Sequence, residues 1–156
     1  MESFKFTGLS PSPFQELFLM DDQTLKSMNI RRVIAKHKPG YPCRVSLVDA
    51  DVGEELLLLP FVHHPVNSPY KSEGPIYIRR EAKTYQPADN EIPEILLHRS
   101  LSFRAYDAKG MMRTAATAAG SKTADIIREM FTDPAIAYLH IHNSGPGCYN
   151  CQVVRA

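Results

Sequence analysis

Long apolar runs and an excess of charge are both lacking from this sequence. Its apolar runs are short, as in residues 56–59, whereas a helix that spans a membrane needs about 20 apolar residues. The first residues include the acidic Glu2 and no long apolar core, so they do not predict a secretory signal. A net charge of +1 gives no overall field that would attract nucleic acid or an anionic membrane. We therefore expect neither a nucleic-acid partner nor a membrane partner.

Cysteine and glycine are also scarce. Three cysteines are an odd number and too few for a disulfide scaffold, so we predict a cytoplasmic protein with reduced thiols. The chain has 12 prolines but only 8 glycines, which favours connections of fixed shape over flexible ones. No internal repeat, low-complexity tract or linker divides the sequence. Residues 1–156 are therefore expected to form one compact domain.

Short strands dominate what is present, with a few short helices between them. Alternating or apolar segments predict strands, which cover residues 4–7, 31–36, 43–48, 55–61, 75–80, 100–107, 135–142 and 151–155. The segments 43–48 and 55–61 flank a turn cluster and predict a β-hairpin. Start signals near Ser12 and Asp21 predict two short helices, and residues 120–123 open another. The fold class predicted is α+β, with a largely antiparallel mixed sheet and a few short helices.

The segment HIHNSGPGCYNC, residues 140–151, concentrates side chains that bind metals. Successive side chains of a strand point to opposite faces, so the apolar Leu139 and Ile141 share one face of the strand 135–142. His140 and His142 then share the other face, about 6–7 Å apart. Two imidazoles at that spacing can reach one ion.

Two cysteines follow at the turn after this strand. Cys148 and Cys151 would lie about 10 Å apart in an extended chain, but a turn at Tyr149 and Asn150 would bring the thiols together. Two imidazoles and two thiolates form a tetrahedral donor set for zinc, although their order matches no familiar zinc-finger spacing. The candidate zinc ligands are His140, His142, Cys148 and Cys151.

Two other interpretations of this segment stay open. A redox pair is disfavoured because only a strand-like segment follows Cys151, and reactive thiols usually owe their low pKa to a helix N-terminus. The cysteines can also be ordinary packing residues beside a hairpin turn, because small thiols pack well in a core.

The proline-restricted segment 61–75 is a second candidate site. It is longer than most connections between elements, and ordered loops on a rigid scaffold often carry function. Its polar side chains form a candidate ligand-binding set of His63, His64, Ser68, Tyr70, Lys71 and Glu73. The alternative is a surface loop whose polar residues are only solvated. Arg104 and Tyr106 share one face of their strand and would line a polar pocket with His140 and His142 if the two strands are neighbours.

Four segments carry a resemblance to a known family: FKFTGL (residues 4–9), PGYPCRVSL (39–47), SPYKSEGPIYIR (68–79) and CYNCQVVRA (148–156). They resemble a bacterial family known only as domain of unknown function 1203. The resemblance spans nearly the whole chain. It implies a small bacterial cytoplasmic protein and supplies no activity, substrate or catalytic residue.

We interpret the protein as one with a polar pocket near its C-terminal turn that binds a small molecule or a metal ion. A zinc ion held by all four candidate ligands would be structural, whereas an open coordination position would allow hydrolysis. The competing interpretation is an interaction protein without chemistry. In that case the terminal strand 152–155, or another exposed sheet edge, would pair with a second copy and form a homodimer.

Overall fold

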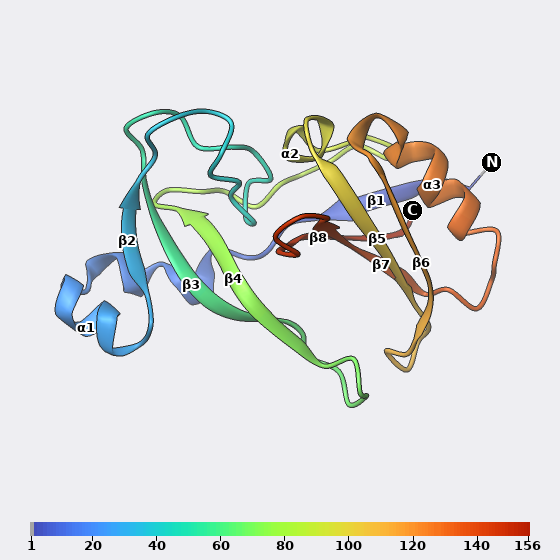
Figure 1. The fold of residues 1–156 in the computed structure, drawn as a ribbon, viewed down its shortest axis with the longest axis horizontal. Coiled ribbons are helices and arrows are strands. Elements are labelled where there is room, and N and C mark those ends of the chain that lie inside the picture. The colour runs from blue at the N-terminus through green and yellow to red at the C-terminus, as the bar shows by residue number, and fades with distance from the viewer. Residues whose placement is uncertain (1) are drawn as a thin grey trace.

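The computed structural model describes residues 2–156 and consists of two sheets that lie side by side (Figure 1). The five-stranded sheet has the order β1-β8-β7-β5-β6, and the three-stranded sheet has the order β2-β3-β4. The strands are β1 (Phe4–Thr7), β2 (Arg31–Ile34), β3 (Glu55–His64), β4 (Ser72–Arg79), β5 (Ser100–Tyr106), β6 (Met112–Ala119), β7 (Tyr138–Asn143) and β8 (Tyr149–Arg155). Every pairing between these strands is antiparallel, which confirms the predicted α+β class.

One face of the five-stranded sheet is apolar and packs against helices. Alternation along β5 and β7 puts Phe103 and Ile141 on this face, where both are fully buried. The face is covered by α2 (Glu94–Leu97) and α3 (Thr123–Met130), which follows the 3₁₀ turn η3 (Gly120–Lys122). The apolar stripe of α3, with Ile127 at its centre, faces the sheet because its apolar residues recur at helical spacing. The polar residues of the same strands therefore point to the opposite face.

The three-stranded sheet has its own apolar core, covered by the N-terminal helical segments. These are η1 (Ser12–Phe14), η2 (Glu16–Leu19) and α1 (Asp22–Ser27), and α1 begins where the Asp21 side chain accepts a hydrogen bond from the Thr24 amide. Phe14 and Leu25 belong to this core together with Ile76 of β4. Within residues 2–156, no helix is long and apolar enough to cross a membrane.

The first and last strands of the chain are hydrogen-bonded neighbours. Phe4 of β1 pairs with Arg155 of β8, while the other edge of β8 pairs with β7. In sequence, the strands of the three-stranded sheet come after β1 and before the other four strands of the five-stranded sheet (Figure 1). Because both edges of β8 are occupied, the terminal strand 152–155 is not available to pair with a second copy, contrary to that form of the dimer hypothesis.

Three local predictions differ from the structure. Residues 43–48 form a turn segment instead of a strand, so β3 pairs with β2 and β4 and the predicted hairpin is wrong. β6 was not predicted, because the sequence MRTAATAA of an exposed edge strand carries no apolar alternation. The long loop is shorter than expected, since β3 continues to His64 and β4 begins at Ser72.

Arg44 lies inside this turn segment and joins it to the five-stranded sheet. Its side chain is only 2% exposed, and burial lowers its pKa to about 10. The Nε atom donates to the Tyr149 carbonyl at 2.7 Å, and Nη1 donates to the Pro42 carbonyl. No carboxylate of residues 2–156 forms an ion pair with it. The buried cation is thus held by backbone carbonyls, and these carbonyls depend on it for hydrogen bonds.

We expect Arg44→Ala to lower the free energy of unfolding by at least about 2 kcal/mol, because it leaves a cavity and two buried carbonyls without their charged donor. Urea unfolding measures this difference. The matched control is Arg31→Ala on the exposed side of β2, which should stay within about 0.5 kcal/mol of the wild type. Equal effects of the two substitutions would contradict the structural role of Arg44.

Candidate metal centre

The polar face of the five-stranded sheet carries side chains in rows across the strands. Gln152, His140, Arg104 and Ala115 lie opposite one another on β8, β7, β5 and β6. Directly paired residues of antiparallel strands point to the same face, so these side chains share the face away from the helices. The structure therefore confirms that β5 and β7 are neighbours. The predicted polar pocket of Arg104 and Tyr106 with His140 and His142 depends on this pairing.

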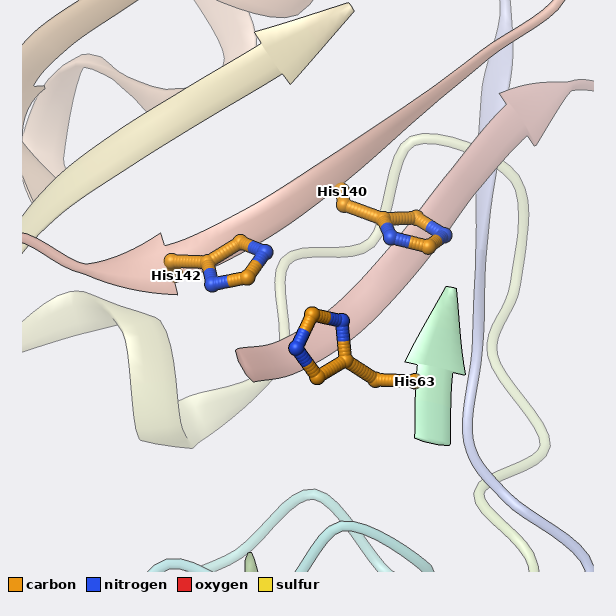
Figure 2. A group of neighbouring side chains, drawn as sticks. All are labelled: His63, His140 and His142. Atoms are coloured by element: carbon orange, nitrogen blue, oxygen red, sulfur yellow. The ribbon is translucent and has the colours of Figure 1, made fainter. Parts of the chain in front are cut away.

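A third histidine reaches this face from the other sheet. His63, near the end of β3, His140 and His142 each offer one ring nitrogen, and the three nitrogens lie within 4.8 Å of one another. Figure 2 shows the three rings converging on one point, two from β7 and one from β3. The register of β3 shifts between Phe61 and His64, and such an irregularity re-aims side chains at the end of a strand. Two candidate sites that the sequence presents separately thus meet at one place.

Hydrogen bonds to two carbonyl oxygens settle which nitrogens carry protons. His140 Nε2 lies 3.0 Å from the side-chain oxygen of Gln152, and His142 Nδ1 lies 2.9 Å from the Gly147 carbonyl oxygen. A carbonyl oxygen only accepts, so both of these nitrogens donate. The remaining nitrogens, Nδ1 of His140 and Nε2 of His142, keep their lone pairs.

Both of these nitrogens, and Nδ1 of His63, are buried and have no partner in the described chain. His63 Nδ1, His140 Nδ1 and His142 Nε2 all lack a hydrogen bond within the described residues. In Figure 2 these are the nitrogens that face the centre of the group. Histidines that bind a metal usually donate their other N–H to a carbonyl or carboxylate, as His140 and His142 do here.

Burial keeps all three rings neutral near neutral pH. The pKa is lowered to about 4 for His63, to about 4 for His140 and to about 3 for His142. Burial is the largest cause in each case, and the nearby positive charge of Arg104 lowers each pKa further. Neutral imidazole is the form that binds metals.

A second layer of contacts holds His63 in place. Its ring stacks on Tyr149 with centroids 5.2 Å apart and an interplanar angle of 6°. The Tyr149 carbonyl accepts the hydrogen bond from Arg44, so the buried guanidinium supports the residue on which His63 rests.

His64 lies beside the group but its ring nitrogens are already engaged. Nδ1 donates to the Tyr70 carbonyl at 2.7 Å, which leaves Nε2 to accept from the Tyr138 hydroxyl at 2.6 Å. Its ring lies 4.9 Å from that of His140 and 4.2 Å from that of Tyr106. Three residues of the predicted ligand-binding set, His64, Tyr70 and Tyr106, therefore gather in an aromatic cluster next to the three histidines.

The structure does not bring the two cysteines to the histidines. Cys151 pairs with Ile141 and lies with it in the apolar core, on the opposite face of the sheet, where burial raises the pKa of its thiol. Cys148 follows the hairpin turn and is not part of the group of possible ligands found within residues 2–156. The expected set of two histidines and two cysteines is replaced by three histidines, because the register shift after Ile141 turns Cys151 inward.

The remaining residues of the predicted set lie elsewhere. The Ser68 hydroxyl donates to the Gly110 carbonyl at 2.8 Å and has a structural role in the loop. Lys71 and Glu73 are exposed and line a surface hollow together with Val62 and Ser72. None of the three histidines lines that hollow.

Comparison with known proteins gives one family match. The model of a family described as "Protein of unknown function (DUF1203)" matches residues 40–155, which include His63, His140 and His142. Neither the curated proteins nor the solved structures contain a match to the chain.

We expect the metal-free protein to lose stability as the pH falls from about 7 to about 5. The folded-state pKa values lie below the ordinary value of 6.5, so below that pH the unfolded chain binds more protons than the folded one. Urea unfolding in the presence of a chelator, at several pH values, measures the effect. His142→Gln removes one of the three groups and should show a shallower loss, whereas an unchanged slope would contradict this assignment.

Proposed function

The chain belongs to the DUF1203 family, and we propose that it binds one divalent transition-metal ion, preferably zinc, through His63, His140 and His142. One observation carries the proposal: three buried ring nitrogens without a protein partner in the described residues converge on one point. Each buried polar atom left unpaired costs about 1–3 kcal/mol, so three at one place require an explanation. A shared cation supplies it.

The donor set favours zinc or a similar ion over magnesium or calcium. Imidazole suits zinc, copper, iron and nickel, whereas magnesium and calcium require oxygen ligands. Two imidazole nitrogens that share a tetrahedral zinc ion at about 2.0–2.1 Å lie about 3.3 Å apart. The nitrogens of the group lie within 4.8 Å of one another, so small rotations of the rings would complete the geometry.

Three protein ligands leave a fourth coordination position for water. No other His, Cys, Asp or Glu within residues 2–156 joins the group, and the ring nitrogens of His64 are engaged by Tyr70 and Tyr138. Catalytic zinc sites have this composition, with three protein ligands and one exchangeable position. A zinc ion held in this way would lower the pKa of its water to about 7 and so would supply a nucleophile for hydrolysis or hydration of a small molecule. We therefore propose an enzyme-type centre over a purely structural one.

We place this activity in the cytoplasm as part of the same proposal. Support comes from Cys43, Cys148 and Cys151, which are all free thiols in the structure. Reduced thiols are typical of that compartment.

We expect metal-free wild-type protein to bind about one zinc ion per chain, measured by elemental mass spectrometry and by titration calorimetry. His140→Ala and His142→Ala should each weaken zinc binding by more than about 100-fold, because they remove a ligand. Gln152→Leu keeps all three ligands but removes the acceptor that orients His140, and should weaken binding by about 10- to 100-fold.

The matched controls are His98→Ala, an exposed histidine on another part of the surface, and Cys148→Ser. Both should bind zinc as the wild type does, with circular dichroism confirming that every variant is folded. Wild-type protein that takes up no zinc would overturn the proposal. A loss of zinc in Cys148→Ser as large as that in His142→Ala would restore the cysteine-containing site.

A homodimer stays a second, independent proposal for the sheet edge at β6. Within the described chain, β6 pairs only with β5, and its residues are mostly small and exposed. Arg113 is the only charged residue on this strand, so few charged side chains oppose the pairing of another strand at this open edge. Light scattering should show a dimer that Thr117→Pro converts to a monomer, and a wild-type monomer would refute this proposal.

A further inference from the structure

Arg104 is a cation without a carboxylate partner beside the histidine group. It lies directly opposite His140, one strand away, and shares the polar face of the sheet with it. Six other arginines form ion pairs with carboxylates, namely Arg32, Arg79, Arg80, Arg99, Arg113 and Arg155. Among residues 2–156, Arg104 forms none.

The hydrogen-bond donors of Arg104 are largely unused. Its Nε atom donates to the Ser102 hydroxyl at 3.3 Å, and Ser102 lies opposite His142. The side chain therefore runs along β5 toward the position of His142. No carboxylate or carbonyl of the described chain accepts from the two Nη groups, although the Tyr106 hydroxyl interacts with the guanidinium. The Ser102 hydroxyl, which accepts from Nε, still has its own proton to donate.

Exposure changes steadily across the sheet and places Arg104 at the open side of the centre. In one row Ala115 of β6 is exposed, Arg104 of β5 is half-buried, and His140 of β7 is 2% exposed. The next row repeats the pattern, from the exposed Thr117 through the half-buried Ser102 to His142, which is 1% exposed. A small molecule that approaches over β6 and β5 meets Arg104 before it reaches the histidines.

The charges of the centre call for an anion. Three neutral imidazoles and a divalent ion leave the full metal charge uncompensated, and the guanidinium adds another positive charge. The group of possible ligands contains no carboxylate. Uncompensated positive charge in a partly buried site favours a negatively charged ligand.

We infer that the metal centre binds a small oxyanion, a carboxylate or phosphate group, between the fourth coordination position and the guanidinium of Arg104. This inference rests on the proposed metal site and names its substrate class. One anion oxygen would take the place of the metal-bound water. The second carboxylate oxygen, or the remaining phosphate oxygens, would accept hydrogen bonds from the Nη groups of Arg104 and from the Ser102 hydroxyl. The planar guanidinium fork matches both anions, which makes Arg104 the positioning residue for the substrate.

The test is a calorimetric titration of inorganic phosphate, and separately of acetate, into zinc-loaded full-length protein. Wild-type protein should bind at least one of the two anions, and the one bound more tightly identifies the group that the substrate carries. Arg104→Met should weaken that binding by about 10- to 100-fold, because hydrogen bonds to charged groups are lost. Arg104→Lys keeps the charge but lacks the planar guanidinium. Its anion affinity should lie between those of the wild type and of Arg104→Met.

The matched control is Arg31→Met, which removes the same charge from the exposed side of the other sheet and should bind anions as the wild type does. Zinc affinity should be unchanged or slightly higher in Arg104→Met, since a like charge is removed. If wild-type protein binds zinc but neither anion, or if Arg104→Met binds the anion as tightly as wild type, the inference is wrong while the metal site stands. If wild-type protein binds no zinc, the metal site is wrong and the inference falls with it.

Discussion

The alternation of side chains along β7 is the constraint on which the rest of the site depends. Leu139 and Ile141 must face the apolar core, because burying them is what attaches the helices to the sheet. The same alternation puts His140 and His142 on the opposite face, where both point toward the end of β3. Their neighbours on that face follow from strand register, which puts Gln152 on one side and Arg104 on the other. A core requirement thus places both histidines on one face, with the acceptor that orients His140 and a cation in the same row as His140.

The hairpin turn between β7 and β8 has a chemical role as well as a geometric one. Gly147 adopts a φ of 82°, a conformation that glycine adopts without strain, and its carbonyl accepts a hydrogen bond from the Nδ1–H of His142. On the return strand, Tyr149 stacks on His63 and receives a hydrogen bond from Arg44. The turn therefore fixes the tautomer of His142, and the residues after it fix the position of His63. This support comes from both sheets, so the site depends on their correct docking.

Sequence patterns predicted the parts of this arrangement that depend on local alternation, and missed those that depend on register or docking. The shared face of His140 and His142 follows from a period of two residues and needs no tertiary information. The inward direction of Cys151 depends on the register shift between Ile141 and His142, and a one-residue slip moves a side chain to the other face. His63 was identified as a polar residue near a loop, but no local pattern shows which distant strand the end of β3 approaches. The turn at Arg44 alternates like a strand, and only the burial of its guanidinium against Tyr149 reveals why the chain bends there.

A metal ion at this point would also act on the fold, because its ligands come from both sheets. His63 belongs to the three-stranded sheet, and His140 and His142 belong to the five-stranded sheet, so coordination would join the two (Figure 2). Without the ion, three buried ring nitrogens stay without a partner in the described chain and destabilise the contact between the sheets. A ligand that binds only the folded state stabilises it by about 2.7 kcal/mol at 100 times its dissociation constant. A closed site with four protein ligands would give the same stabilisation. Under the proposed function, Arg104, which forms no ion pair within residues 2–156, favours an open centre over a closed one, because a purely structural ion has no need of a cation beside it.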